Sequence, residues 1–188
     1  FMRDYLSVKT GKIPRIGEVY EEFKLYINSD RSSESIEENV KDTFNFSNHY
    51  SKIVLRKEKD KDLQEMFSNI LKLKVDVAYP FILPVYNDYV HGLVSKDDFI
   101  SILKLVESYV FRRAICGIPT NSLNKTFGNL YKSVNTENYR ESVQASFQLL
   151  DSYKRFPDDT EFEKEIISKD VYNFRSRNYL LSKLENFK

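Results

Sequence analysis

Several residue types that would indicate a particular function or location are scarce in this sequence of 188 residues. Cys116 is the only cysteine, so no disulfide can form within the chain, and a reducing compartment is expected. No apolar run approaches the roughly 20 residues that cross a bilayer. Arg3 and Asp4 interrupt the first residues, where a signal peptide would continue as an apolar segment. We therefore expect a cytoplasmic protein with no membrane partner.

An excess of one charge is also missing. The chain has 29 basic and 28 acidic residues, for a formal net charge of +1. Global charge therefore gives no indication of a nucleic-acid partner, although a local basic patch stays compatible with the sequence. Tryptophan is absent, and glycine and proline number five each, which favours a packed helical protein over a disordered one.

Helical periodicity dominates what is present. The clearest segment runs from about residue 96 to 116, where Ser95 and Asp98 resemble a capping box and Gly117 is expected to end the helix. This segment is apolar on nearly all sides, as buried central helices are. We predict an all-α fold, an irregular bundle of about seven to nine helices around this central helix.

Further helices are expected along most of the chain, and no strand pattern competes with them. Spaced apolar residues, among them Ile36, Val40 and Phe44, indicate a helix after the polar loop SDRSSES. Pro80 suits a first helical turn, whereas Pro84 is expected to kink or restart the helix. The remaining expected helices follow Leu63–Leu71, Leu123–Tyr131 and Val143–Leu150, then 158–167 and 174–187.

The domain organisation follows from length and from the two ends. The chain is predicted to form a single helical domain over 1–188, with a candidate subdomain break near 92–95. The starting sequence FMRDYLSVKT and the final LLSKLENFK both resemble the middle of a helix. We therefore expect a fragment of a longer protein. The charged run RKEKDKD at 56–62 is expected to be a solvated loop and first helical turn.

The patterns required for catalysis are not found. His49 and His91 have no second histidine or cysteine at ligand spacing, so no metal site is predicted. Cys116 is interpreted as an inert buried thiol, because the end of a helix disfavours a thiolate. The acidic stretch PDDTEFEKE at 157–165 resembles a helix start more than a nuclease site, since Asp158 and Glu161 have capping spacing. No catalytic residue is predicted.

The adjacent arginines in SYVFRRAICGIPTNSLNKTF, Arg112 and Arg113, are the remaining candidates. They point about 100° apart on a helix, so at least one must approach the core, where it needs a carboxylate or carbonyl partner. One hypothesis is an internal tie that clamps the turn at 117–120. The other is a contact with phosphate or with a partner domain, in which Asn121, Asn124 and Lys125 are further binding or interdomain candidates.

The same stretch resembles a known family. YVFRRAICGIPTNSLNKTFGNLY is similar to the helical middle region of the GmrSD-type restriction endonucleases. Further similar passages follow in the expected order over nearly the whole chain: MRDYLSVKTGKIP, VYEEFKLYI, YPFILPVYNDYVHGLVSKDDFISILKLVESY, RFPDDTEFEKEI and DVYNFRSRNYLLSKLEN. Within the family pattern, Arg112, Arg113, Asn121 and Asn124 match the R-R and T-N-x-L-N positions.

The resemblance implies a function for a longer parent protein. In that family a ParB-like N-terminal domain is associated with nucleotide hydrolysis, and a C-terminal HNH domain cuts foreign or modified DNA in bacterial defence. Neither signature occurs here, so no catalytic residue is carried over and no cofactor is expected in this segment. The expected role is an inert helical connector between these two domains that contacts DNA backbone. The parent is expected to use a nucleoside triphosphate and a divalent metal.

A second hypothesis comes from another class of protein. A near-neutral helical domain can also serve as a protein-interaction or dimerisation module that does not touch DNA. Homo-oligomer formation is compatible with either hypothesis.

Overall fold

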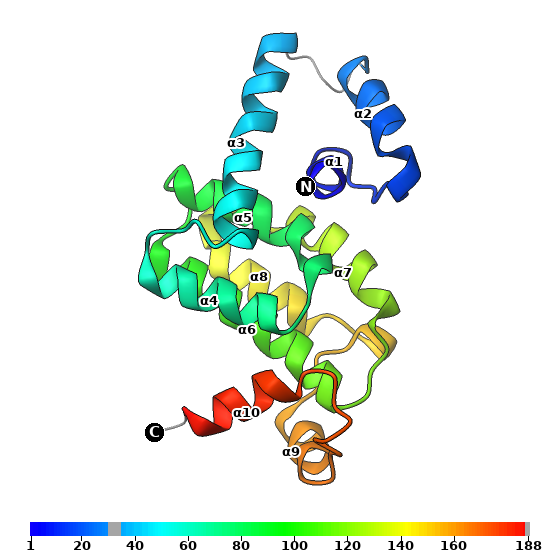
Figure 1. The fold of residues 1–188 in the computed structure, drawn as a ribbon, viewed down its shortest axis with the longest axis vertical. Coiled ribbons are helices and arrows are strands. Elements are labelled where there is room, and N and C mark those ends of the chain that lie inside the picture. Colours follow the sequence, from blue (N-terminus) through cyan, green and yellow to red (C-terminus); the bar gives the residue numbers. More distant parts are fainter. Residues whose placement is uncertain (30–34, 187–188) are drawn as a thin grey trace.

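A computed structural model describes residues 1–29 and 35–186. Within these residues all regular structure is helical, and this confirms the all-α prediction (Figure 1). The α-helices are α1 (Met2–Thr10), α2 (Val19–Ile27), α3 (Ile36–Val54), α4 (Lys61–Lys72), α5 (Tyr79–Val90), α6 (Lys96–Ile115), α7 (Leu123–Leu130), α8 (Tyr139–Gln148), α9 (Asp159–Ile167) and α10 (Arg177–Glu185). The described residues thus contain ten α-helices, compared with an expected seven to nine. Short 3₁₀ turns join several of them, including η2 (Asp76–Ala78), η3 (Thr120–Ser122) and η6 (Ser152–Lys154).

Helix α6 forms where the sequence predicts a helix and packs inside the bundle. Its start is capped by Ser95, whose hydroxyl accepts a hydrogen bond from the backbone N–H of Asp98 at 3.1 Å. It packs against α4, α5, α8 and α9 (Figure 1). The helix ends just before Gly117, whose φ of 66° is a left-handed conformation that glycine adopts without strain.

Helix α5 is buried along more of its length than α6. Every residue from Ala78 to Tyr86 is buried, and the helix runs through Pro84 without the expected restart. Proline in a helix interior removes one backbone hydrogen bond. Here the flanking Leu83 and Val85 are both fully buried, so tertiary packing favours the continuous helix despite that loss.

The hydrophobic core has two parts. The larger cluster extends from Tyr5 in α1 to Tyr179 in α10 and includes residues on both sides of the candidate break at 92–95. A smaller cluster forms at the end of α6, where Ile115 packs with Phe174 and Leu180. We call residues 159–185, with α9 and α10, the C-terminal unit. In Figure 1 this unit lies at the bottom of the molecule, with α9 packed against α6 and α10 against α4.

Helix α3 is the longest element at the opposite end of the molecule. It forms where the spacing predicts a helix, and Ser35 caps it in a reciprocal capping box with Glu38. Its C-terminal half packs through Phe46 and Ile53, whereas Ile36, Val40 and Phe44 are exposed. The N-terminal half reaches the top of the molecule, at about the height of α2 (Figure 1). Residues 30–34 of the expected polar loop, and Phe187 of the expected last helix, lie outside the described residues.

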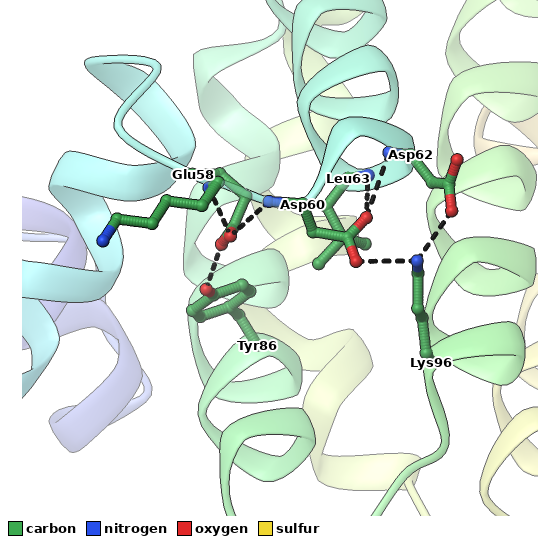
Figure 2. Close-up of polar contacts among 7 residues, drawn as sticks. Glu58, Asp60, Asp62, Leu63, Tyr86 and Lys96 are labelled. Atoms are coloured by element: carbon green, nitrogen blue, oxygen red, sulfur yellow. Dashed lines mark hydrogen bonds and ion pairs between the residues drawn. The ribbon is translucent and has the colours of Figure 1, made fainter.

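The charged run at 56–62 is a loop followed by the first turn of α4, and five of its seven residues are exposed. Glu58 accepts a hydrogen bond from the hydroxyl of Tyr86 in α5 and from the backbone N–H of Lys59 and Asp60 (Figure 2). The side chain of Asp60 caps α4, and Lys96 bridges Asp60 and Asp62 at 2.7 and 2.6 Å. The predicted loop and first helical turn are therefore confirmed, and the sequence did not show that Glu58, Asp60 and Asp62 have partners on helices distant in sequence.

Candidate functional site

The guanidinium of Arg113 is buried, with only 2% of the residue exposed. Its Nη1 donates to the carbonyl oxygens of Tyr153 at 3.0 Å and Arg155 at 3.4 Å. Its Nη2 donates to the carbonyl oxygen of Pro119 at 2.8 Å and to Ser122 Oγ at 2.9 Å. Arg113 therefore joins the turn after α6 to the segment around η6.

Arg112 points to the other side of the same segment. It donates to the carbonyl oxygen of Pro157 at 3.2 Å and pairs with Asp159, at the start of α9, at 2.5 Å. Its guanidinium also lies 5.0 Å from the ring centroid of Phe162. We call these contacts of Arg112 and Arg113 with residues 153–159 the arginine clamp. The tie proposed from the sequence was to the turn at 117–120, and only the hydrogen bond from Arg113 to the Pro119 carbonyl oxygen is of that kind. The contacts with 153–159 were not expected from the sequence.

Two neighbouring contacts extend the clamp. The hydroxyl of Tyr109 donates to the carbonyl oxygen of Lys154 at 2.8 Å. From the C-terminal unit, Lys169 Nζ donates to the carbonyl oxygens of Ala114 and Ile115, at 3.2 and 2.7 Å. A cation at the last carbonyls of a helix complements the helix dipole. The end of α6 is thus held by polar contacts to segments more than 40 residues away.

The charge of Arg113 is not balanced by a neighbouring acid. Within the described residues its hydrogen-bond partners are carbonyl and hydroxyl oxygens, and no carboxylate lies at ion-pair distance. Burial lowers the pKa of Arg113, because removal from water disfavours the charged form. Its Nε is buried and, among the described atoms, has no hydrogen-bond partner. The site therefore has uncompensated positive charge.

A cavity of about 610 Å³ adjoins Arg113 and the turn after α6. The candidates Asn121 and Asn124 line this cavity, and both side chains are exposed. Lys125 does not line it and instead lies with Asn124 at a separate depression beside α1. Arg112 lines another cavity on the side of α8 and α9. Of the five predicted candidates, three residues thus meet at one cavity.

Sequence reasoning missed two basic residues of the same cavity, Lys74 and Arg175. Lys74 follows α4 and has a φ of 56°, a left-handed conformation that is uncommon for residues other than glycine. Arg175 precedes α10. Neither belongs to a motif, and their sequence positions are far from Arg113. Only the packing of α4 and α10 near the end of α6 places them together.

The residues tested for catalytic chemistry have other roles in the structure. Cys116 is half-buried, although a buried thiol was expected, and this partial burial raises the pKa of its thiol, which disfavours the reactive thiolate. His49 is buried and lies 3.3 Å from Asn87 Oδ1. The side chain of Asp158 accepts the Glu161 N–H at 2.8 Å, and this confirms the predicted cap of α9. No group of three or more His, Cys, Asp or Glu side chains in 1–29 and 35–186 is placed to hold a metal ion.

Comparisons with family models, with curated proteins and with solved structures found no match to this chain. Among the helices that the structure describes, none has the length and apolar character needed to cross a membrane.

Proposed function

We propose that this chain is a helical connector that holds flanking modules in a defined orientation. The observation that supports the proposal is the arginine clamp. Arg113 of α6 donates to carbonyl oxygens near η6, while Arg112 pairs with the first residue of α9. Breaking the contacts of a buried guanidinium leaves carbonyl groups unpaired, which is costly. Residues 153–157 lead directly into the C-terminal unit, and Lys169 of that unit donates to the last carbonyl oxygens of α6. A displacement of the C-terminal unit would therefore be transmitted to α6.

The parent protein that we propose is a GmrSD-like, nucleotide-dependent DNA endonuclease that acts in the cytoplasm against foreign or modified DNA. This assignment is supported by the ordered set of similar passages, of which the R-R and T-N-x-L-N stretch is one. In the parent, a ParB-like domain would hydrolyse a nucleoside triphosphate with a divalent metal. An HNH domain would cut DNA, and the segment itself would be catalytically inert.

Two direct tests address this assignment. The purified segment is incubated with Mg²⁺ or Mn²⁺, nucleoside triphosphate, and plain or modified DNA, and no cleavage or hydrolysis is expected. Reproducible activity of the segment would contradict the proposal. The sequence encoded on either side gives the second test, because a ParB-like signature should precede the segment and an HNH set should follow it.

The connector role predicts a specific defect in the parent protein. Arg113→Met should lower DNA cleavage while nucleotide hydrolysis persists, because the two modules would lose their fixed relation. Ile53→Ala is the matched control: Ile53 is buried in α3, far along the chain from the clamp, and its truncation costs about 2–5 kcal/mol of stability. Equal losses of cleavage in the two variants would attribute the defect to stability alone and argue against coupling.

One observation favours the alternative, a protein-interaction or dimerisation module. Ile36, Val40 and Phe44 recur every four residues along α3 and are 76%, 63% and 64% exposed. If a second copy covers this row, the double variant Val40→Asp, Phe44→Asp should convert a dimer to a monomer in light scattering. Salt-sensitive DNA binding that weakens in Lys125→Gln would instead favour the connector with its DNA contact.

A further inference from the structure

The cavity beside Arg113 is built from four separate parts of the chain. The segment from Leu73 to Val77 forms one wall, and the last turns of α6 form another. The turn entering α7 and the residues 174–176 before α10 complete it. Its volume of about 610 Å³ falls within the range of about 300–1,000 Å³ that is usual for small-molecule sites.

Positive charge predominates in this cavity. Three cationic side chains line it, those of Lys74, Arg113 and Arg175, compared with one carboxylate, that of Asp76. Arg113 is 2% exposed, has only neutral oxygen partners, and its Nε has no partner among the described atoms. Lys74 and Arg175 are exposed and form no ion pair within the described residues. The cavity therefore carries about two positive charges in excess. Lys74 and Arg175 are available to an anion, whereas Arg113 contributes its charge from the buried wall, with both Nη atoms already hydrogen-bonded.

Neutral donors add to the basic groups at one edge. Thr120, Asn121 and Asn124 line the cavity, and their side chains make no hydrogen bond within the described part of the chain. This arrangement supplies hydrogen-bond donors beside the cations, as phosphate recognition requires.

The remaining walls are apolar. Val75, Val110, Ile118, Leu123 and Phe174 are buried residues that line the same cavity. A bare inorganic ion would leave most of this volume and surface without a partner. The ligand that fits has an anionic group at the basic edge and an apolar or aromatic body against these walls.

We infer that this cavity binds a small phosphate monoester with an apolar or aromatic body. A phosphate monoester carries about −1.5 to −2 charges at pH 7, which matches the excess positive charge, whereas a single carboxylate would balance half of it. The inference depends on the cavity alone and is independent of the connector role. Bound ligand would contact the ends of α4 and α6 and the starts of α7 and α10 together.

The test uses the full chain and 1-naphthyl phosphate as the probe, with binding measured by titration calorimetry at pH 7.5. Inorganic phosphate and 1-naphthol are the two partial ligands. We expect 1-naphthyl phosphate to bind at least tenfold more tightly than either, because only it satisfies both the basic edge and the apolar walls. Equal affinity for 1-naphthol and its phosphate would overturn the inference, as would the absence of binding at millimolar concentration.

Variants locate the site. The double variant Lys74→Gln, Arg175→Gln should weaken binding of 1-naphthyl phosphate at least tenfold, since it removes both exposed cations without altering the buried Arg113. Lys104→Gln, an exposed lysine on α6 that does not line this cavity, should bind as the unaltered chain does. Unchanged affinity in the double variant would overturn the inference. Binding of a short DNA duplex without binding of 1-naphthyl phosphate would also overturn it and indicate nucleic-acid backbone as the ligand.

Discussion

Arg113 in α6 donates a hydrogen bond of 3.0 Å to the carbonyl oxygen of Tyr153, in the turn η6. The contact joins the central helix to the start of the segment that leads into the C-terminal unit. It is one of four hydrogen bonds from the same guanidinium, all to oxygens without formal charge. The positive charge of Arg113 is thus stabilised by hydrogen bonds to neutral oxygens and not by an ion pair.

Substitution of the two adjacent arginines should have very different effects on stability. Arg113→Met removes one buried and three part-buried hydrogen bonds, so the free energy of unfolding should fall by about 2–4 kcal/mol. Arg112→Met loses an ion pair with Asp159, a side chain that is 81% exposed, and one part-buried hydrogen bond to Pro157, so it should cost less, about 1 kcal/mol. Urea denaturation of both variants measures the difference.

Arg113→Lys distinguishes charge from geometry in the same experiment. Lysine keeps the positive charge but lacks the planar fork that reaches Tyr153 and Pro119 together. We therefore expect most of the stability loss to remain. If Arg113→Lys is as stable as the unaltered chain, charge alone is sufficient, and the hydrogen-bond geometry of the arginine clamp is not required.

The buried carboxylate of Glu107 offers a second test. It accepts a hydrogen bond from the hydroxyl of Tyr179 and pairs with Lys183 at 2.9 Å. Tyr179→Phe leaves a buried acceptor short of one partner, so the free energy of unfolding should fall by about 1–3 kcal/mol. Tyr172→Phe is the control, because Tyr172 is 81% exposed and its change should stay within about 0.5 kcal/mol. Similar losses in the two variants would contradict the assigned role of the buried pair.

Alkaline pH should unfold the protein through its tyrosines. Burial raises the pKa of eight of the 13 tyrosines above the usual 10.0, namely Tyr5, Tyr50, Tyr79, Tyr86, Tyr109, Tyr131, Tyr139 and Tyr179. Above pH 10 these phenols ionise in the unfolded chain but not in the folded one, so stability falls as pH rises. Phenolate absorbance should increase in two stages, the second coinciding with loss of helical circular dichroism. A single stage that precedes unfolding would contradict the burial of these rings.

Acidic pH should weaken the contacts of the charged run at 56–62. Partial burial by itself raises the pKa of Glu58, but hydrogen bonds from Tyr86 and from the N–H groups of Asp60 and Lys59 hold that pKa below the usual 4.5. A lowered pKa contributes stability that is present above about pH 4.5 and lost as pH falls through the folded value.

Glu58→Gln should therefore be less stable than the unaltered chain at pH 7, with the difference shrinking below about pH 4.5. Thermal unfolding at a series of pH values measures it. Glu65→Gln, an exposed residue of α4, is the matched control and should show no such convergence. If the difference in stability between Glu58→Gln and the unaltered chain stays constant down to pH 3, the acid-sensitive contact does not involve Glu58.

Local signals were sufficient for much of the fold. Helix starts at Ser95 and Asp158 and the stop at Gly117 depend on contacts within a few residues, and they lie where the spacing predicts them. The central helix follows from apolar side chains on nearly all its sides. The need of a buried arginine for oxygen partners likewise follows from the position of Arg112 and Arg113 in an apolar run.

Tertiary structure decided which groups meet. Periodicity located α3 but could not show that Ile36, Val40 and Phe44 lie beyond the main core, because exposure depends on what packs alongside. Pro84 remains within α5 because burial on all sides outweighs one lost hydrogen bond. The carbonyl partners of Arg113 and the cavity with Lys74 and Arg175 come from segments distant in sequence. The sequence alone thus determined the helices and the need of a buried arginine for oxygen partners. Long-range packing determined which oxygens bind Arg113 and formed the cavity beside it.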